Sequence, residues 1–235
     1  MIKGILYGLG LGPGNPELIT VKAWRLLSTV EVIAYPKPPT GESFARKIAA
    51  PFIPDDATEV ALIIPMASER APAQQAYDSA VKTIADHLEN GKDVAFISNG
   101  DPFLYSTFMY VHERLKQRFE IEIVPGVTSL TAAAAATRRP LAARNDILKV
   151  LPAPLDSDTL KAQIATADSV IINKVGKHFN RVRVVIEELG LVENTQIVEN
   201  ATTEYEVARP LSQIKDGEQP YFTTMIIYKG SENWT

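Results

Sequence analysis

The sequence predicts an α/β protein with two domains, an N-terminal parallel sheet with helices in residues 1–126 and a C-terminal mixed α/β domain in residues 127–235. In the first half, five short apolar runs alternate with segments of helical periodicity, which is typical of parallel sheets with crossover helices. In the second half, the helices between strands are fewer and shorter, which favours a mixed sheet. We therefore place the domain boundary near Gly126.

The elements of the first half follow from these patterns. Strands are expected at residues 2–6, 30–35, 60–64, 94–98 and 121–124. Apolar residues at helical spacing between Ile19 and Leu27 predict one helix, and a second runs from Ala73 to Leu88 before Asn90-Gly91 ends it. Ligands of open parallel sheets bind at the carboxyl ends of the strands. Three glycine- and proline-containing turns fall at such ends, which predicts a ligand site there.

The second half has its own set of expected elements. An alanine-rich helix at 129–137 leads into it, and further helices are expected near 159–166 and 180–189. Strands are expected at residues 147–151, 169–173, 196–199, 204–208 and 221–228.

Composition excludes several classes of protein. The 235 residues contain no cysteine, so disulfides, thiolate metal sites and cysteine nucleophiles are excluded. The three histidines lack zinc-site spacing, and we expect no metal. A formal net charge of −4 argues against nucleic acid as a partner. No apolar run approaches the roughly 20 residues of a spanning helix, and no signal peptide is evident. We expect a cytoplasmic protein without a membrane partner.

The first turn, GLGLGPGNPELITVKA from Gly8 to Ala23, invites a dinucleotide interpretation and does not satisfy it. Counted from Gly8, the third glycine of the G-x-G-x-x-G fingerprint falls on Pro13, and counted from Gly10 it falls on Asn15. Proline has no N–H to offer a pyrophosphate. The P-loop ending Gly-Lys-Ser/Thr is also absent. This loop therefore lines a ligand other than a diphosphate.

The other two turns each allow a structural and a functional interpretation. In Ser98–Phe103, Asp101 can cap a helix that begins at Pro102, or Gly100 and Asp101 can present a backbone and a carboxylate to a ligand. In Pro125–Ser129, Thr128 or Ser129 can serve as an N-cap or lie beside that ligand.

Basic residues gather in two places after residue 137. These are Arg138, Arg139 and Arg144, and then Lys174, Lys177, His178, Arg181 and Arg183. Such a set is either a solvated face or an anion-binding wall for a polycarboxylate.

Taken together, the three turns resemble the motifs of the tetrapyrrole methylases, the S-adenosylmethionine-dependent enzymes of corrin and siroheme synthesis. The matching segments are GLGLGPGNPELITVKA, SNGDPFLYSTF and EIVPGVTSLTAA, in this order across the first 136 residues. Four further segments resemble the branch of the family that methylates C20 of precorrin-2 or cobalt-precorrin-2. They are IPMASERAPAQQAYD, LAARNDILKVLPAPL, INKVGKH and YFTTMIIYKG.

The resemblance implies a two-domain tetrapyrrole methylase-like fold with the active-site cleft between the domains, and a homodimer. It implies that S-adenosylmethionine binds and leaves as S-adenosylhomocysteine, and that a tetrapyrrole is the substrate. The implied cofactor-binding residues are Pro13, Asn99, Gly100, Asp101, Leu104, Thr128, Ser129, Val175, Ala201, Thr223, Thr224 and Met225. Asp101 and Tyr105 are candidates for proton removal, and Arg138, Arg139 and Arg144 for binding the substrate carboxylates.

Two residues depart from the family pattern. Asn15 stands where the first motif usually has an acid, and Asn99 where the second usually has Gly or Glu. These two residues leave open the alternative that the protein binds a nucleoside or a tetrapyrrole without catalysing a reaction. Methylation at another tetrapyrrole position, and the presence or absence of cobalt in the substrate, also stay open.

Overall fold

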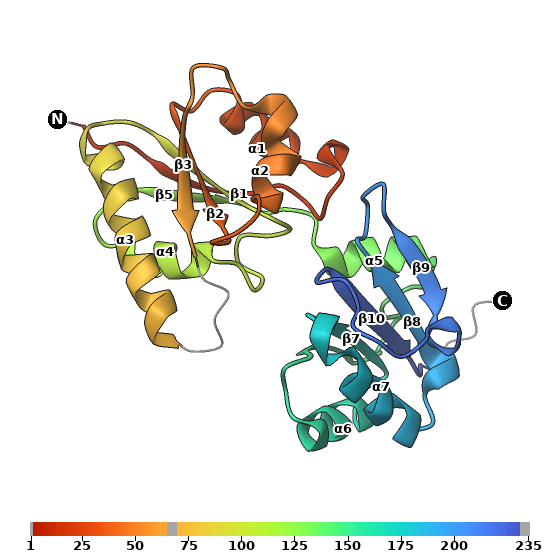
Figure 1. The fold of residues 1–235 in the computed structure, drawn as a ribbon. Coiled ribbons are helices and arrows are strands. Elements are labelled where there is room, and N and C mark those ends of the chain that lie inside the picture. The colour runs from red at the N-terminus through yellow and green to blue at the C-terminus, as the bar shows by residue number, and fades with distance from the viewer. Residues whose placement is uncertain (1, 65–69, 231–235) are drawn as a thin grey trace. The chain divides into compact units, whose positions relative to one another are not determined.

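The computed structural model describes residues 2–64 and 70–230, with the side chains of residues 70–73 left aside. The chain divides into two compact units, residues 1–128 and residues 129–235 (Figure 1). Of the motif at 64–78, residues 65–69 lie outside the described residues. No helix in the described ranges has the length and apolar character needed to cross a bilayer.

Unit 1 is built on a five-stranded parallel sheet, as predicted. Its strands are β1 (Leu6–Gly10), β2 (Val32–Lys37), β3 (Thr58–Ile63), β4 (Val94–Ser98) and β5 (Ile121–Val124). They lie in the order β3-β2-β4-β1-β5. The chain leaves β1 toward β2 on one side and leaves β4 toward β5 on the other. The connections that follow the neighbouring strands β1 and β4 therefore run in opposite directions along the sheet. In open α/β sheets, a crevice forms at the carboxyl ends of the strands at such a switch point.

Helices cover both faces of this sheet. They are α1 (Val21–Leu27), α2 (Phe44–Ala49), α3 (Arg70–Glu89) and α4 (Phe108–Leu115). Alternate strand residues serve two cores: Val94 and Phe96 pack with α3 and α4, while Ala95 and Ile97 pack with α1 and α2. Figure 1 shows the two helix pairs on opposite sides of the strands. Both faces are thus buried, which is why the strands read as continuous apolar runs.

Two predictions for unit 1 differ from the observed bounds by four residues or more. The first strand was expected at residues 2–6, yet β1 spans Leu6–Gly10 and Ile2 is 93% exposed. The glycines that were interpreted as a loop belong to this strand. Gly8 has no side chain there because a Cβ would lie 2.4 Å from the ring of Phe108. The helix expected from Pro102 begins only at Phe108, so Asp101 is not its cap. The short helix α2 was not predicted.

Unit 2 is a mixed five-stranded sheet, also as predicted. Its strands are β6 (Leu148–Pro152), β7 (Ser169–Asn173), β8 (Thr195–Glu199), β9 (Val207–Pro210) and β10 (Thr223–Tyr228), in the order β6-β7-β10-β8-β9. β6 and β7 are parallel, and the other pairs are antiparallel. The strand expected at 204–208 starts three residues later, because Glu206 N donates to Thr203 O and Glu206 itself accepts from Thr202 N.

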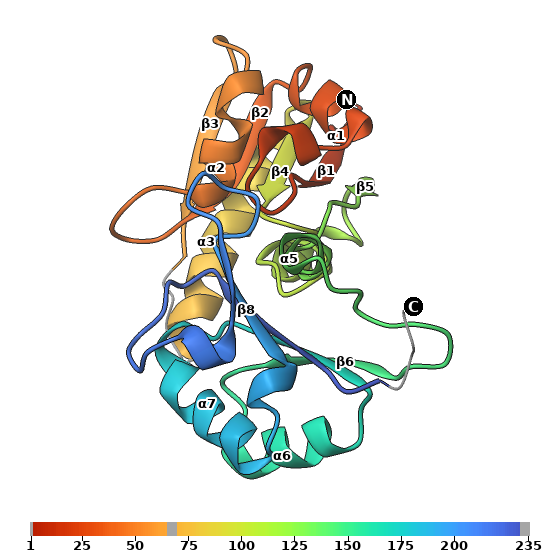
Figure 2. The ribbon, with the colours of Figure 1, turned by 90° about the vertical axis from the view of Figure 1, so that its right-hand side faces the viewer.

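Three helices flank the second sheet. α6 (Ser157–Ala165) and α7 (Phe179–Glu188) contribute to the larger core of the unit with Val170, Ile172 and Met225. α5 (Ser129–Thr137) lies on the other face, where Ala133 packs with Val198 and Ile226 (Figure 2). Its run of small alanine side chains lets this helix approach β8, β9 and β10 closely.

Candidate functional site

The turns after β1 and β4 are joined by a two-residue bridge at the switch point of unit 1. Gly100 N donates to Gly12 O at 2.8 Å, and Gly12 N donates to Gly100 O at 3.3 Å. Both glycines have positive φ, +79° at Gly12 and +69° at Gly100, which side-chain-bearing residues adopt only with strain. The first two sequence motifs therefore meet through their backbones.

The turn after β5 joins the same place through a contact that only glycine permits. A Cβ at Gly126 would lie 2.2 Å from Gly100 O, and one at Gly10 would lie 2.5 Å from Gly126 N. Both neighbours are backbone atoms, which cannot turn aside as a side chain does. We call Gly10, Gly100 and Gly126 the glycine junction. It brings all three motifs to one point.

Asp101 ties two of these turns together. Its Oδ1 accepts from Phe103 N at 2.8 Å, and its Oδ2 accepts from Gly126 N at 3.0 Å. Hydrogen bonds to a charged acceptor are stronger than neutral ones. The carboxylate thus holds the turn after β4 against the turn after β5, which is a role that the expected helix cap did not include.

Asn15 stabilises the turn after β1 with an uncharged side chain. Its side-chain oxygen accepts from Glu17 N at 2.9 Å and caps the short 3₁₀ helix Pro16–Leu18. An amide oxygen performs this capping as well as a carboxylate does. Pro13 is buried in the same loop. The departure at Asn15 therefore leaves the local structure intact.

Asn99, beside the glycine junction, carries an enclosed polar atom. Among the described residues, its Oδ1 has no hydrogen-bond partner. Such groups in native proteins call for a water, an ion or a ligand. Asn99 is one of the expected cofactor-binding residues, and this side-chain oxygen is the group that it could offer a ligand. Leu104 and Tyr105 follow in the turn before α4, where Tyr105 has φ +54° and is 43% exposed.

In unit 2, the expected cofactor-binding residues gather at one edge of the sheet. Val175 N donates to Thr223 O at 3.4 Å, which links the segment after β7 to the start of β10. Asn200 N donates to Phe222 O at 2.9 Å, which brings the turn containing Ala201 to the same edge. The side chains of Val175 and Met225 lie in the core beneath α6 and α7, so only their backbone groups can face a ligand.

The three arginines proposed for substrate binding lie elsewhere. The guanidinium of Arg139 donates to Asn194 O at 3.2 Å and Tyr228 O at 3.4 Å, and stacks over the ring of Tyr228. Asn194 precedes β8 and Tyr228 ends β10, so this is the opposite edge from Thr223. The loop that holds Arg138 and Arg144 is tied there too, since Asp146 accepts from Tyr228 Oη at 2.8 Å. The binding of substrate carboxylates by Arg138, Arg139 and Arg144 stays a prediction.

The second group of basic residues, from Lys174 to Arg183, lies closer to the end of the sheet at Thr223. Some of its side chains already make contacts within unit 2. Arg181 donates to Ala153 O, and Arg183 pairs with Glu187 at 2.8 Å. Burial, and then the charges of Arg181 and Lys177, lower the pKa of His178. A neutral imidazole is thus favoured at this position.

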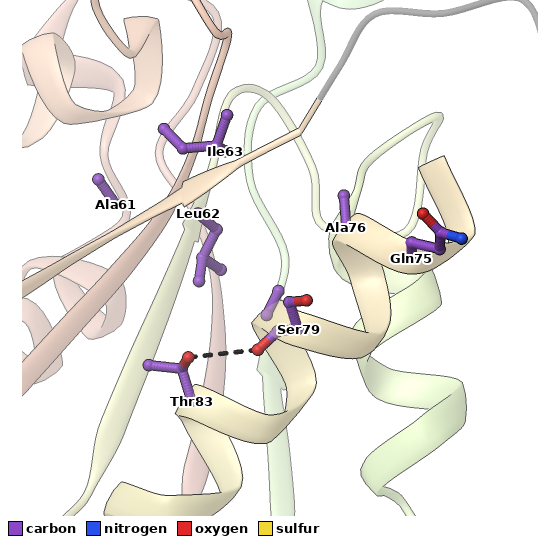
Figure 3. A pocket seen from close by; sticks show the side chains of 8 residues that line it. Ala61, Leu62, Ile63, Gln75, Ala76, Ser79 and Thr83 are labelled. Atoms are coloured by element: carbon purple, nitrogen blue, oxygen red, sulfur yellow. Dashed lines mark hydrogen bonds between the residues drawn. The ribbon is translucent and has the colours of Figure 1, made fainter. Parts of the chain in front are cut away.

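A separate groove of about 420 Å³ lies between β3 and α3 (Figure 3). The residues that line it in the described part are Ala61, Leu62, Ile63, Gln75, Ala76, Ser79, Ala80 and Thr83. None of these eight carries a titratable group, and the Thr83 hydroxyl already donates to Ser79 O. β3 is the edge strand at the far side of the sheet from β5. The groove is therefore separate from the glycine junction.

The fold and the junction define an α/β protein that offers backbone groups, not a phosphate loop, at the switch point of a parallel sheet. The chain belongs to the tetrapyrrole (corrin/porphyrin) methylases, whose family model matches residues 5–214.

Curated relatives cover nearly the whole chain. A cobalamin biosynthesis protein CobIJ of Mycobacterium tuberculosis is 38% identical over 97% of this chain, which spans only 46% of that relative. A precorrin-2 C(20)-methyltransferase of a Sinorhizobium species is 30% identical, with 95% of each chain covered. A cobalt-precorrin-2 C(20)-methyltransferase of Salmonella typhimurium is 31% identical, covering 97% of this chain and 98% of the relative.

Solved structures share the fold. A cobalt precorrin-4 methyltransferase superposes with a TM-score of 0.73 at 25% identity, covering 95% of this chain and 94% of its own. A uroporphyrin-III C-methyltransferase from Thermus thermophilus, complexed with S-adenyl homocysteine, gives a TM-score of 0.71 at 23% identity, with 95% and 97% covered.

Proposed function

We propose that the chain is an S-adenosylmethionine-dependent methyltransferase of cobalamin biosynthesis that methylates C20 of precorrin-2 or cobalt-precorrin-2. The observation that carries this proposal is the match, over almost the full length of both chains, to relatives named as C20-methyltransferases with and without cobalt. Membership of the methylase family and the three turns that meet at the glycine junction support the same function.

The residues at the junction suit the proposed methyl donor. S-adenosylmethionine carries a sulfonium cation and a neutral nucleoside, and it needs no cradle of N–H groups for phosphate. Pro13 offers no N–H, the carboxylate of Asp101 lies at the junction, and the enclosed oxygen of Asn99 can accept a hydrogen bond. We propose that Pro13, Asn99, Gly100, Asp101, Leu104, Thr128 and Ser129 hold the donor from unit 1.

Unit 2 supplies the rest of the proposed donor site. Val175, Ala201, Thr223, Thr224 and Met225 are proposed to enclose the adenosine. Because the side chains of Val175 and Met225 are in the core, these two would contribute backbone groups. The division at residue 126 and a site between the two domains stay predictions.

The proposed mechanism rests on positioning. S-adenosylmethionine, when bound, supplies an electrophilic methyl group, and little acid or base help is needed to activate it. The chain then has to orient the reactants and exclude water, which can account for much of a rate enhancement. Both oxygens of Asp101 accept backbone N–H groups, so we propose that it fixes the turns in place. Tyr105 stays a candidate for holding the proton that leaves C20.

A turnover assay tests the proposal. Purified protein receives S-adenosylmethionine labelled in the methyl group, with precorrin-2 and cobalt-precorrin-2 in parallel reactions. Transfer of label to either macrocycle supports an enzyme, and the faster of the two identifies the substrate. A protein that binds S-adenosylhomocysteine in calorimetry but transfers no label to either is a binding homologue, and the proposal then fails.

We further propose that the protein works in the cytoplasm as a homodimer. Both properties are implied by the resemblance to the family, and they are open to direct measurement. Light scattering coupled to size-exclusion chromatography should give about twice the 25.8 kDa mass of one chain. A mass of one chain at micromolar concentration would contradict the dimer.

A further inference from the structure

Asn173, the last residue of β7, carries a side-chain oxygen that the described residues leave without a hydrogen-bond partner. The residue is 9% exposed, and its Oδ1 is enclosed with no hydrogen-bond partner among the described residues. Its backbone carbonyl, by contrast, accepts from Ala153 N at 2.9 Å. A buried carbonyl oxygen without a donor is costly, so its retention calls for an explanation.

The direction of this side chain follows from the strand. Val170 and Ile172 belong to the core beneath α6 and α7, so Ile171 and Asn173 face the other side of the sheet. On β10, Ile226 pairs with Ile171 and Met225 with Ile172. The antiparallel register therefore brings Thr224 across from Asn173 on that same face.

Asn173 thus lies among the residues proposed to enclose the adenosine. Thr224 is its cross-strand neighbour, and Val175, two residues further on, donates from its N–H to Thr223 O. Lys174, between them, has φ +57°, which turns the chain sharply directly after the strand. No carboxamide role was assigned at this position from the sequence.

We propose that Asn173 recognises the adenine ring of the methyl donor through its carboxamide, an inference that rests on the proposed function. A carboxamide presents an acceptor and a donor side by side in one plane, and adenine presents the matching amino donor beside a ring-nitrogen acceptor. The methionine carboxylate offers only acceptors, and its ammonium only donors. Only the amide rotamer that places its oxygen at the amino group and its NH2 at the ring nitrogen matches this edge of the base.

The test compares two ligands that differ only in this edge. The analogue of S-adenosylhomocysteine with purine in place of adenine has a hydrogen where the amino group was, so it keeps the ring-nitrogen acceptor and has no donor on this edge. Calorimetry is run on the wild-type protein, on Asn173→Ala and on Asn145→Ala, the last an exposed asparagine in the loop before β6. We expect Asn173→Ala to bind S-adenosylhomocysteine about tenfold more weakly, and to lose clearly less affinity for the purine analogue, since the wild type makes one hydrogen bond fewer to it. Asn145→Ala should match the wild type with both.

A second variant separates ligand recognition from folding. Asn173→Leu has a similar volume and removes the unpaired oxygen, so its apo melting temperature should equal or exceed that of the wild type. It should still lose affinity for S-adenosylhomocysteine. A residue needed only for structure would instead lower the melting temperature.

Each outcome bears on the proposal. Equal loss of affinity for both ligands, or unchanged affinity for S-adenosylhomocysteine in Asn173→Ala, overturns adenine recognition by Asn173 and leaves the proposed function standing. Wild-type protein that binds neither ligand overturns both. A larger loss of affinity for S-adenosylhomocysteine than for the purine analogue supports the assignment.

Discussion

The carboxylate of Asp101 accepts a hydrogen bond from the backbone N–H of Gly126 at 3.0 Å, across 25 residues of sequence. This contact joins the turns that follow β4 and β5, next to the point where the backbones of Gly10 and Gly100 leave no room for a side chain at Gly126. The two turns are thereby fixed relative to each other before any ligand arrives. A prearranged backbone of this kind suits a reaction whose rate depends on orientation.

Removal of the Asp101 carboxylate should therefore affect both stability and binding. We expect Asp101→Ala to lower the free energy of unfolding by about 2 kcal/mol, because two backbone N–H groups lose a charged acceptor. The affinity for S-adenosylhomocysteine should fall as well. Urea unfolding and calorimetry measure the two effects, with the exposed Asp55→Ala as the control. A variant as stable as the wild type would show that the contact does not hold the turns.

The glycine junction predicts a steric penalty at Gly126. A methyl group there would meet Gly100 O at 2.2 Å, so Gly126→Ala should cost about 3 kcal/mol of stability, the upper range for overpacking. At Gly41, φ is +94° and no atom lies within 4 Å of an added Cβ. Gly41→Ala should thus cost only about 1 kcal/mol, from backbone strain. Equal losses in thermal or urea unfolding would contradict the close approach of the turns.

Arg139 should prove structural. Arg139→Ala removes two hydrogen bonds to carbonyl groups and the contact with the ring of Tyr228, and we expect a loss of about 2 kcal/mol in unfolding free energy. The KM for the tetrapyrrole should stay unchanged. Arg138→Ala, at the exposed neighbouring residue, is the matched control and should leave stability unchanged. A raised KM with unchanged stability would restore Arg139 to the substrate site.

The lowered pKa of His178 predicts that the stability of the protein depends on pH. Its pKa is lowered from 6.5 by burial, and further by Arg181 and Lys177, so the unfolded chain binds its proton more readily than the folded one. The stabilising effect is present above pH 6.5 and is lost as the pH falls through the pKa of the folded state. Between pH 8 and pH 5, the wild type should therefore lose more unfolding free energy than His178→Gln. An equal loss of unfolding free energy in the wild type and in His178→Gln would contradict this role of His178.

Much of the fold could be predicted because its signals are local. The strands at 94–98, 121–124 and 169–173 were predicted with their observed bounds, since each is a mainly apolar run followed by polar, glycine or proline residues. The first strand was misplaced because Gly8 and Gly10 look like a loop in sequence. They are strand residues whose missing side chains make room for Phe108 and Gly126, and such contacts are not visible in sequence.

The site was only partly predictable for a similar reason. The three turns could be located at strand ends, but the hydrogen bond from Gly126 to Asp101 joins residues too far apart in sequence for any pattern to reveal. The arginines were chosen by charge, and charge alone does not reveal that Arg139 donates to Asn194 O and Tyr228 O. Asn173 carried one signal, a polar residue that ends an apolar strand within the segment INKVGKH.

The most direct test of the central claim is to locate the transferred methyl group. Protein supplied with precorrin-2, or its cobalt form, and S-adenosylmethionine enriched in ¹³C at the methyl should give a product whose new carbon resonance correlates with C20. A label at another carbon of the macrocycle, or an unlabelled macrocycle in the presence of protein that binds S-adenosylhomocysteine, would contradict the account.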